Sequence, residues 1–246
     1  MRVVIFGATQ GMGRAVARIL AERGDQVFVL GIEPEELART AADLQARSPG
    51  HLPVGVALCD LADPSSFAAA LDAAQADLGD VECVVVTAAI FATQEAMEAD
   101  IDRTELLLRL DFTNTVVFCE HVRRRLLARG GGTLCVFSSV AGDRGRKPVV
   151  LYGAAKAGLS HYLEGIDHRH HEHGLRVITV KPGFVKTGMT VGLKPPPFAG
   201  EPVAVAKSVV RAIDRGTPVV YAPGIWRLIM LVICALPRFV MRKIGF

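Results

Sequence analysis

A tyrosine and a lysine stand one helical turn apart in this sequence, with a serine a short loop upstream. Tyr152 and Lys156 are spaced i and i+4, so in a helix both side chains leave the same face. A phenol ionises near pH ~10, and a neighbouring ammonium group makes it a better acid or base at neutral pH. Ser139 ends an apolar run and could hold a substrate oxygen while Tyr152 moves the proton. The same Tyr and Lys spacing also occurs on ordinary helix faces, so the rest of the chain must distinguish the two interpretations.

A glycine-rich turn near the start of the chain follows a short β-branched run and precedes an amphipathic stretch. The run Arg2–Phe6 stops at Gly7, and residues 14–21 have the apolar spacing of a helix. Glycines in such a turn allow a close backbone approach, and the helix N-terminus offers free N–H groups to a pyrophosphate. The turn therefore predicts a dinucleotide site. Its residues are Gly7, Ala8, Thr9, Gln10, Gly11, Met12 and Gly13.

Apolar runs alternate with helical segments along most of the chain. This alternation predicts an α/β fold with a doubly wound parallel β-sheet (a Rossmann fold) covered on both faces. We expect one dinucleotide-binding domain over residues 1–222 that includes the catalytic site, and a helical tail over residues 223–246. The predicted strands cover residues 2–6, 26–31, 54–58, 82–86, 133–137, 175–180 and 218–221. Helices are predicted from about residue 63 and over residues 102–129 (one helix or a broken pair), 149–173 and 203–215.

The composition narrows the class of protein. Half of the 246 residues are hydrophobic and 22% are charged, which is enough apolar material for a large core. The net charge of +3, without a dense basic face, argues against nucleic-acid binding. Five scattered cysteines favour buried thiols in a reducing cytoplasm. The first apolar run reads as a strand and is too short for the apolar region of a signal peptide. We interpret the histidines in residues 161–173 as a solvated helix surface and expect no metal site.

The end of the second strand is where such folds select their cofactor through the ribose. The residues there are Gly31, Ile32 and Glu33, with no cation to receive a 2′-phosphate, so the sequence leans towards NAD over NADP. Glu33 could bond the ribose or could interact with the start of the next helix through its charge. Arg14 and Arg39 could still serve a phosphate from elsewhere.

With these motifs in order, the chain resembles the short-chain dehydrogenase/reductase family from residue 1 to about residue 221. The resemblance implies hydride transfer between a nicotinamide cofactor and a carbonyl or alcohol carbon. It implies that Ser139 orients the carbonyl, Tyr152 transfers the proton, and Lys156 binds the nicotinamide ribose and lowers the Tyr152 pKa. By the same resemblance, Asp60 meets the adenine and Thr187 the carboxamide. The cofactor residues that it implies are Gly7, Thr9, Gln10, Gly11, Met12, Gly13, Asp60, Leu61, Ala88, Tyr152, Lys156, Val185 and Thr187.

Two departures from the family pattern affect the site. Residues 87–89 are Thr-Ala-Ala where the family usually has Asn-Ala-Gly, which should leave Ala88 beside the cofactor backbone. Alignment from Ser139 places the family's catalytic Asn on Asp111, whose charge would favour a protonated Lys156. A shift of one turn would instead give that role to Asn114. We prefer Asp111.

Residues 139–246 are further similar to the reductases of decaprenylphosphoryl-2-keto-pentose. The similarity rests on residues 141–147, 189–194, 222–227 and 236–243. It implies a lipid-linked keto-sugar or a similar bulky lipid ketone as substrate. We separately expect a homodimer or homotetramer. A lipid ketone reductase of the 3-ketosphinganine or 3-oxoacyl type is the alternative enzyme, and a non-catalytic dinucleotide sensor or scaffold is the alternative from another class.

The C-terminal tail combines apolar residues with cations. Residues 225–236 are apolar apart from Arg227, but a helix of that length spans only ~18 Å and cannot cross a bilayer core of ~30 Å. After Pro237 the sequence suits a helix lying on a membrane, here the inner face. Alternatively, both pieces fold back over the substrate cleft or a partner subunit. The proline-rich residues 194–198 are either part of a substrate lid or a plain connector.

Overall fold

The computed structural model describes residues 1–196 and 198–245. Pro197, within the proline-rich stretch, and Phe246, the last residue of the predicted tail, lie outside the described residues.

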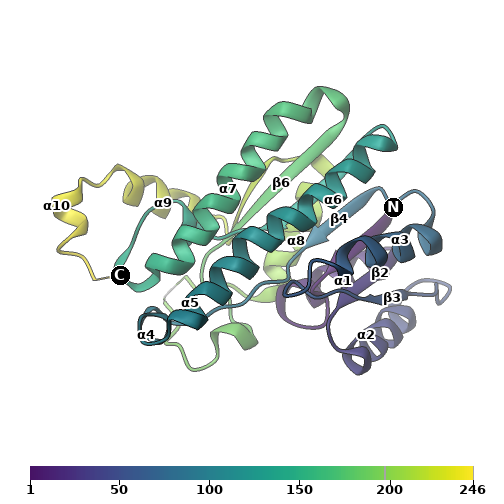
Figure 1. Ribbon diagram of the computed structural model, residues 1–246, viewed down its shortest axis with the longest axis horizontal. Helices are drawn as coiled ribbons and strands as arrows, with labels where there is room; N and C mark the ends of the chain where they lie inside the picture. Colours follow the sequence, from purple (N-terminus) through teal and green to yellow (C-terminus); the bar gives the residue numbers. More distant parts are fainter. Residues whose placement is uncertain (197, 246) are drawn as a thin grey trace.

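Seven parallel strands form the central sheet in the order β3-β2-β1-β4-β5-β6-β7 (Figure 1). The chain builds the sheet outward from β1 to β3 and then returns to the other side of β1 with β4. The strand order therefore reverses between β1 and β4, and the prediction of a doubly wound parallel sheet is confirmed. In such sheets ligands bind at this reversal, beyond the carboxyl ends of the strands. The strands are β1 (Arg2–Phe6), β2 (Gln26–Gly31), β3 (Gly55–Leu58), β4 (Cys83–Val86), β5 (Gly132–Phe137), β6 (Leu175–Pro182) and β7 (Val219–Ala222).

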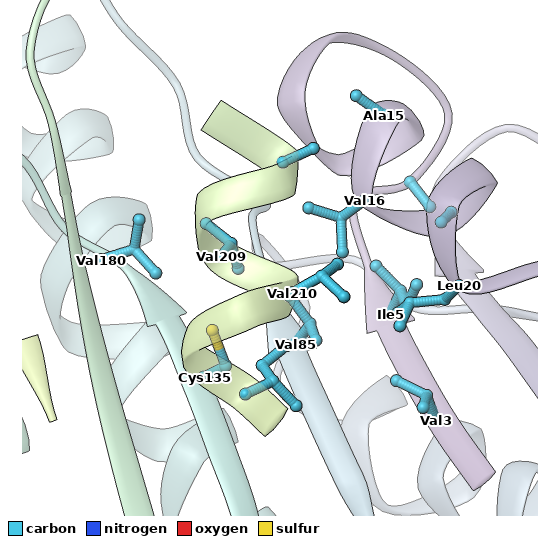
Figure 2. Packing of buried hydrophobic residues seen from close by; sticks show 14 of the residues in the cluster. Val3, Ile5, Ala15, Val16, Leu20, Val85, Cys135, Val180, Val209 and Val210 are labelled. Carbon is cyan, nitrogen blue, oxygen red and sulfur yellow. The ribbon is translucent and has the colours of Figure 1, made fainter. Parts of the chain in front are cut away.

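Three helices cover one face of the sheet. They are α1 (Gly11–Glu22), α2 (Pro34–Arg47) and α8 (Pro202–Arg215). Figure 2 shows Val16 of α1 and Val210 of α8 pointing towards each other above Ile5 of β1 and Val85 of β4. Because these residues are buried, this core fixes where the glycine turn before α1 sits on the sheet.

The opposite face carries α3 (Ser66–Leu78), α6 (Thr115–Ala128) and α7 (Val150–His170). Three aromatic rings pack together in this second core. The centre of the Phe118 ring lies 4.9 Å from that of Phe6 and 5.3 Å from that of Phe67. The packing anchors α7, the helix that carries Tyr152 and Lys156, firmly against β5 and β6.

The predicted helix over residues 102–129 is one continuous run with a change of winding in the middle. It consists of α5 (Ile101–Leu108), the π-helical turn η1 (Arg109–Asn114) and α6, and the short α4 (Gln94–Glu98) precedes it. Asp111 and Asn114 both lie in the π turn and both are buried. Such turns are wider than an α-helix and occur frequently at functional sites.

Several element boundaries differ from those expected. The α3 helix begins at Ser66 because the carbonyl and carboxylate of Asp63 accept hydrogen bonds from the N–H groups of Ser66 and Ser65, which makes residues 63–65 a turn. The β6 strand continues to Pro182 because it pairs with β7 up to Ala222. After α7, residues His171–His173 form the 3-10 turn η4; the other 3-10 turns are η2 (Val140–Gly142), η3 (Lys147–Val149) and η5 (Gly188–Thr190).

The tail forms two short helices at the end of the molecule opposite α2 and α3, α9 (Ile225–Ala235) and α10 (Arg238–Met241) (Figure 1). One side of α9 folds back onto the body: Trp226, Met230 and Ile233 are buried in a small core with Val140. Within the described chain, no helix has the length and apolar character needed to cross a membrane.

Candidate active site

The first turns of α7 bring Tyr152 and Lys156 to the carboxyl edge of the sheet. The Lys156 ammonium nitrogen lies 5.5 Å from the centre of the Tyr152 ring. Ser139 follows β5 and caps the turn η2, its hydroxyl accepting the Ala141 N–H at 3.1 Å. That hydroxyl is also close enough to the Tyr152 phenol to lower its pKa. The structure therefore brings together the three side chains that the sequence singled out.

The pKa of the Tyr152 phenol is raised above its ordinary value of 10.0. Burial is the largest cause, and the Asp111 carboxylate adds to it. The Lys156 ammonium lowers the pKa, as expected, but by less than burial raises it. The phenol therefore holds its proton at neutral pH, as a proton donor must.

Asp111 and Lys156 form a buried ion pair. Lys156 Nζ lies 3.2 Å from Asp111 Oδ2, and the side chains are 2% and 0% exposed. Asp111 Oδ1 accepts the Ile90 N–H at 2.8 Å, whereas Oδ2 accepts no hydrogen bond of good geometry and depends on the ammonium charge. Burial alone would lower the pKa of Lys156, but Asp111 and Tyr152 raise it above its usual value. Lys156 is therefore charged at neutral pH.

Asn114 lies one turn away and faces a different segment. Its side-chain amide donates to the Leu61 carbonyl at 2.6 Å, in a buried position. The contact joins the π turn to residues 60 and 61 after β3, near the expected adenine position. Of the two candidates for the family's Asn position, Asp111 is therefore the one that contacts Lys156.

The glycine turn is shaped to bring backbone close to a ligand. Gly7 and Gly11 have φ angles of +93° and +56°, which side-chain-bearing residues rarely adopt. A Cβ on Gly13 would lie 2.2 Å from the Gly7 carbonyl oxygen, so the turn packs against the start of α1 with no room for a side chain at residue 13. The α1 helix has no side-chain cap at Gln10, which leaves its first N–H groups available to an anion. These residues fit the pyrophosphate of a dinucleotide.

Residues from two other loops complete the cradle. The Thr87 hydroxyl lies 3.0 Å from the Phe6 carbonyl and 2.9 Å from the Gly7 carbonyl, and donates its hydrogen to this pair. A Cβ on Gly7 would lie 2.6 Å from the Ala88 nitrogen, so Ala88 adjoins the turn. On the opposite side, a Cβ on Gly11 would lie 3.6 Å from the Thr187 side chain.

The remaining expected cofactor residues occupy the same edge of the sheet. Leu61 and Val185 are buried, while Asp60 is half-buried and accepts the Ala62 N–H at 2.8 Å. Glu33 is exposed and does not cap α2 with its side chain.

Glu36 is positioned between the two arginines that could serve a phosphate. Its carboxylate lies 3.7 Å from Arg14 and 2.9 Å from Arg39. Arg14 also donates to the Thr9 carbonyl in the glycine turn. Both arginines that the sequence offered for a phosphate are therefore already paired with a carboxylate.

Two neighbours of the site were not singled out from the sequence. The Phe91 ring meets the Tyr152 ring edge to face, with centres 5.2 Å apart. The Ser138 hydroxyl donates to the Lys156 carbonyl at 2.9 Å and joins β5 to α7. Neither residue belongs to a sequence motif. Only their positions just after β4 and β5, at the carboxyl edge of the sheet, could have indicated that they lie near the site.

In the histidine-rich end of α7, the rings of His170 and His173 lie 6.0 Å apart. Over the described ranges, no group of three or more His, Cys, Asp or Glu side chains gathers as a metal site would require.

Comparison with known proteins decides the family. The family model described as short chain dehydrogenase matches residues 1–196. The chain belongs to the short-chain dehydrogenase family. It is 33% identical over 241 residues to an uncharacterized oxidoreductase of Mycobacterium tuberculosis (strain ATCC 25618 / H37Rv), covering 98% of this chain and 96% of the relative.

Other members of the short-chain dehydrogenase family are similar over most of the chain. A cis-4-hydroxycyclohexanecarboxylate dehydrogenase of Sinomonas cyclohexanicum is 33% identical over 193 residues, covering 77% of this chain and 75% of that protein. The solved structure of a levodione reductase superposes with a TM-score of 0.81 at 22% identity, over 90% of this chain and 95% of that one. The protein is therefore an NAD(P)-dependent short-chain oxidoreductase with the Rossmann-like fold of its family.

Proposed function

We propose that this short-chain dehydrogenase reduces a ketone to an alcohol, with Tyr152 as the proton donor. The observation that supports this role most is the geometry: the Lys156 ammonium lies 5.5 Å from the centre of the Tyr152 ring and is held there by the Asp111 carboxylate at 3.2 Å. When bound, NAD(P)H would supply the hydride to the carbonyl carbon. The carbonyl oxygen takes the Tyr152 proton, and the phenolate left behind is stabilised by the Lys156 ammonium.

The other side chains act on this proton transfer. The Ser139 hydroxyl donates to the substrate oxygen and sets its distance from the phenol. Lys156 also binds the nicotinamide ribose. Asp111 is a positioning residue: it acts through Lys156 by holding the ammonium group in place and charged. Asn114 supports the loop at Leu61 and takes no part in the proton transfer.

The proposed cofactor is NAD or NADP, with a preference for NAD. The glycine turn holds the pyrophosphate through Gly7, Thr9, Gln10, Gly11, Met12 and Gly13. Asp60 and Leu61 meet the adenine, Ala88 the cofactor backbone, and Val185 and Thr187 the carboxamide side. The carboxylate of Glu36 disfavours a 2′-phosphate because it pairs with Arg14 and Arg39 and offsets part of their positive charge.

The proposed substrate is a bulky hydrophobic ketone, and a lipid-linked keto-sugar is the more specific candidate. Large apolar side chains in two segments support an apolar substrate: Val140, next to Ser139, lies in one cluster with Trp226 and Phe184, and Met189, Val191 and Phe198 are exposed on the loop after β6. Residues 223–246 serve as a lid or a peripheral anchor at the inner face of the membrane. The assembly is a homodimer or homotetramer in the cytoplasm.

The test is cofactor oxidation with a panel of ketones of increasing apolar length. The panel includes a polyprenylphosphoryl 2-keto-pentose, 3-ketosphinganine, a 3-oxoacyl thioester and 4-oxocyclohexanecarboxylate, each with NADH and NADPH. We expect kcat/KM to rise with the length of the apolar part and to be highest for the lipid-linked keto-sugar. Cofactor binding without turnover of any member would instead favour a dinucleotide sensor or scaffold.

A further inference from the structure

The helices of the tail present two unlike sides. The inner side of α9 is buried, whereas its outer side exposes large apolar residues to solvent. Leu231 is 70% exposed, and Phe239 of α10 is 66% exposed. We call this outer surface the tail face; it consists of Ile225, Leu228, Leu231, Val232 and Phe239. A monomer seldom exposes so many neighbouring apolar residues without a binding purpose.

The charges around the tail face have one sign. Residues 216–246 contain no Asp or Glu. Arg227 lies within α9, and the α10 region contributes Arg238, Arg242 and Lys243. The neighbouring carboxylate of Asp143 is engaged by the Lys181 ammonium at 2.6 Å and the Tyr221 hydroxyl at 2.9 Å. The tail therefore contributes only basic charges around its apolar face, and the adjacent Asp143 carboxylate is paired with Lys181.

We propose that the tail face docks on an anionic phospholipid bilayer; the consequence for catalysis rests on the function proposed above. The apolar side chains enter the boundary between head groups and acyl chains, and the cations meet the phosphates. A second copy of this chain fits less well. A two-fold contact would set the same cations against one another, and the tail carries no carboxylate to pair with them.

The helix α9, which carries most of the tail face, contacts both loops that border the active site through its inner side. On one side, Val140, the residue after Ser139, packs in the same core as Trp226 and Met230. On the other side, the Trp226 indole N–H donates to the Phe198 carbonyl at 3.3 Å, and a Cβ on Gly183 would lie 2.0 Å from the indole nitrogen. Docking therefore holds the mouth of the site at the membrane surface.

Two cations strengthen this attachment from the loop between Ser139 and Tyr152. Arg144 donates to the Leu236 carbonyl at 2.8 Å, and Lys147 donates to the Arg242 carbonyl at 2.7 Å. Both bonds cross from the catalytic loop to the tail. A ketone anchored in the bilayer would thus meet the active site without leaving the lipid, which makes the substrate class a membrane lipid.

The first test measures sedimentation of the full-length enzyme with vesicles. One set of vesicles contains phosphatidylcholine alone, and the other an equal mixture of phosphatidylcholine and phosphatidylglycerol. We expect binding to the mixed vesicles that weakens with added salt. Leu231→Asp should weaken binding about tenfold or more. The matched control is Leu58→Asp on β3, which changes a side chain that is 56% exposed at the sheet edge opposite β7 and should bind as wild type does.

The second test removes charge. Arg238→Gln with Arg242→Gln should weaken binding roughly fivefold for each cation removed. The control is Lys207→Gln with Arg211→Gln on α8, which removes the same charge elsewhere and should have a much smaller effect. Thermal unfolding of every variant verifies that it is folded. Wild-type protein that fails to sediment with mixed vesicles, or a Leu231→Asp variant that binds as well as wild type, would overturn the proposal.

Two further measurements separate this proposal from its alternatives. Turnover of a short, water-soluble ketone tests the enzyme alone: turnover without vesicle binding rejects the docking surface, and vesicle binding without turnover of any ketone rejects the proposed function. Light scattering tests for a second copy on the tail face. A smaller assembly for Leu231→Asp than for wild type would overturn the assignment to lipid.

Discussion

The ammonium nitrogen of Lys156 lies 3.2 Å from Oδ2 of Asp111, and neither side chain is open to solvent. Both charges have left water, so each depends on the other for its stabilisation. Removing one partner of such a pair leaves an uncompensated buried charge, which costs about 3–5 kcal/mol in proteins. The pair therefore connects catalysis to the stability of the fold.

Asp111→Ala should lower turnover about a hundredfold and also destabilise the protein, because Lys156 loses its counter-charge. Asn114→Ala should weaken the structure around Leu61 and cofactor affinity while leaving kcat within a few-fold at saturating cofactor. Steady-state kinetics and urea unfolding measure the two effects. If Asp111→Ala keeps full turnover and Asn114→Ala abolishes it, the assignment of Asp111 is wrong.

The pH dependence of ketone reduction should change in Asp111→Asn. Tyr152 donates its proton only while protonated, and its pKa is raised above 10.0. Wild-type kcat should therefore stay level through neutral pH and fall only as pH rises through that raised pKa. The carboxylate of Asp111 raises the pKa values of Tyr152 and Lys156, so its loss should move the fall to lower pH. If kcat of the variant fell at the same pH as wild type or at a higher pH, this prediction would be wrong.

The same substitution should alter stability in alkali. The pKa of Lys156 is raised in the folded protein above its ordinary 10.5. Its contribution to stability is therefore present below pH 10.5 and is lost as pH rises through the folded-state pKa. The asparagine variant should lack most of this contribution, and its unfolding free energy should depend less on pH over that alkaline range.

Tyr152→Phe should lower kcat by roughly a thousandfold, because the phenol is the proton donor. Nicotinamide fluorescence should show that cofactor affinity is nearly unchanged. Tyr162→Phe is the matched control: it lies on the same helix, but its hydroxyl donates to Glu120 at 2.7 Å, away from Lys156. Comparable losses in the two variants would point to a general effect on α7.

Glu36→Gln should shift the cofactor preference towards NADP roughly fivefold, because it frees Arg14 and Arg39 for a 2′-phosphate. The ratio of kcat/KM for NADPH to that for NADH measures the shift. Glu35→Gln removes a neighbouring, more exposed carboxylate that lies 3.7 Å from Arg39, and it should have the smaller effect. A larger effect at Glu35 would exclude the Glu36 mechanism.

Gly13→Ala should destabilise the fold by about 3 kcal/mol or more, since its Cβ would meet the Gly7 carbonyl and Thr87 hydroxyl. Gly165→Ala, in open space on α7, should instead stabilise by roughly 0.5–1 kcal/mol. Urea unfolding compares the two. Tolerance of alanine at residue 13 would show that the turn is looser than its geometry indicates.

Local patterns predicted most of the fold. The apolar runs placed every strand within two residues, because the central strands are buried on both faces and read as continuous apolar segments, and the short edge strands β3 and β7 are also apolar in sequence. The motifs likewise brought Ser139, Tyr152 and Lys156 to one edge, since the carboxyl ends of parallel strands meet there. Local sequence indicated less well where elements stop: β6 reaches Pro182 through pairing with β7, a partner about forty residues later.

The sequence patterns did not predict contacts between segments that lie far apart in the chain. Nothing in the spacing of Ile90 and Asp111 shows that a backbone N–H meets a carboxylate there. The net pKa of Tyr152 depends on burial, which the Tyr and Lys spacing does not report. For the same reason the sequence left the position of the tail open, and the structure shows that one side of α9 packs on Val140 while the other remains exposed.

The cysteines offer a direct view of α9. Cys59, Cys83, Cys119 and Cys135 are buried, and burial raises the pKa of their thiols, to about 12 for Cys59 and Cys83. Cys234, on α9, is exposed, although partial burial and the Asp143 carboxylate raise its pKa as well. A maleimide dye applied to the native enzyme in mild alkali should therefore attach at this single thiol, and its emission colour would report the polarity around the tail in real time, without engineering any other residue.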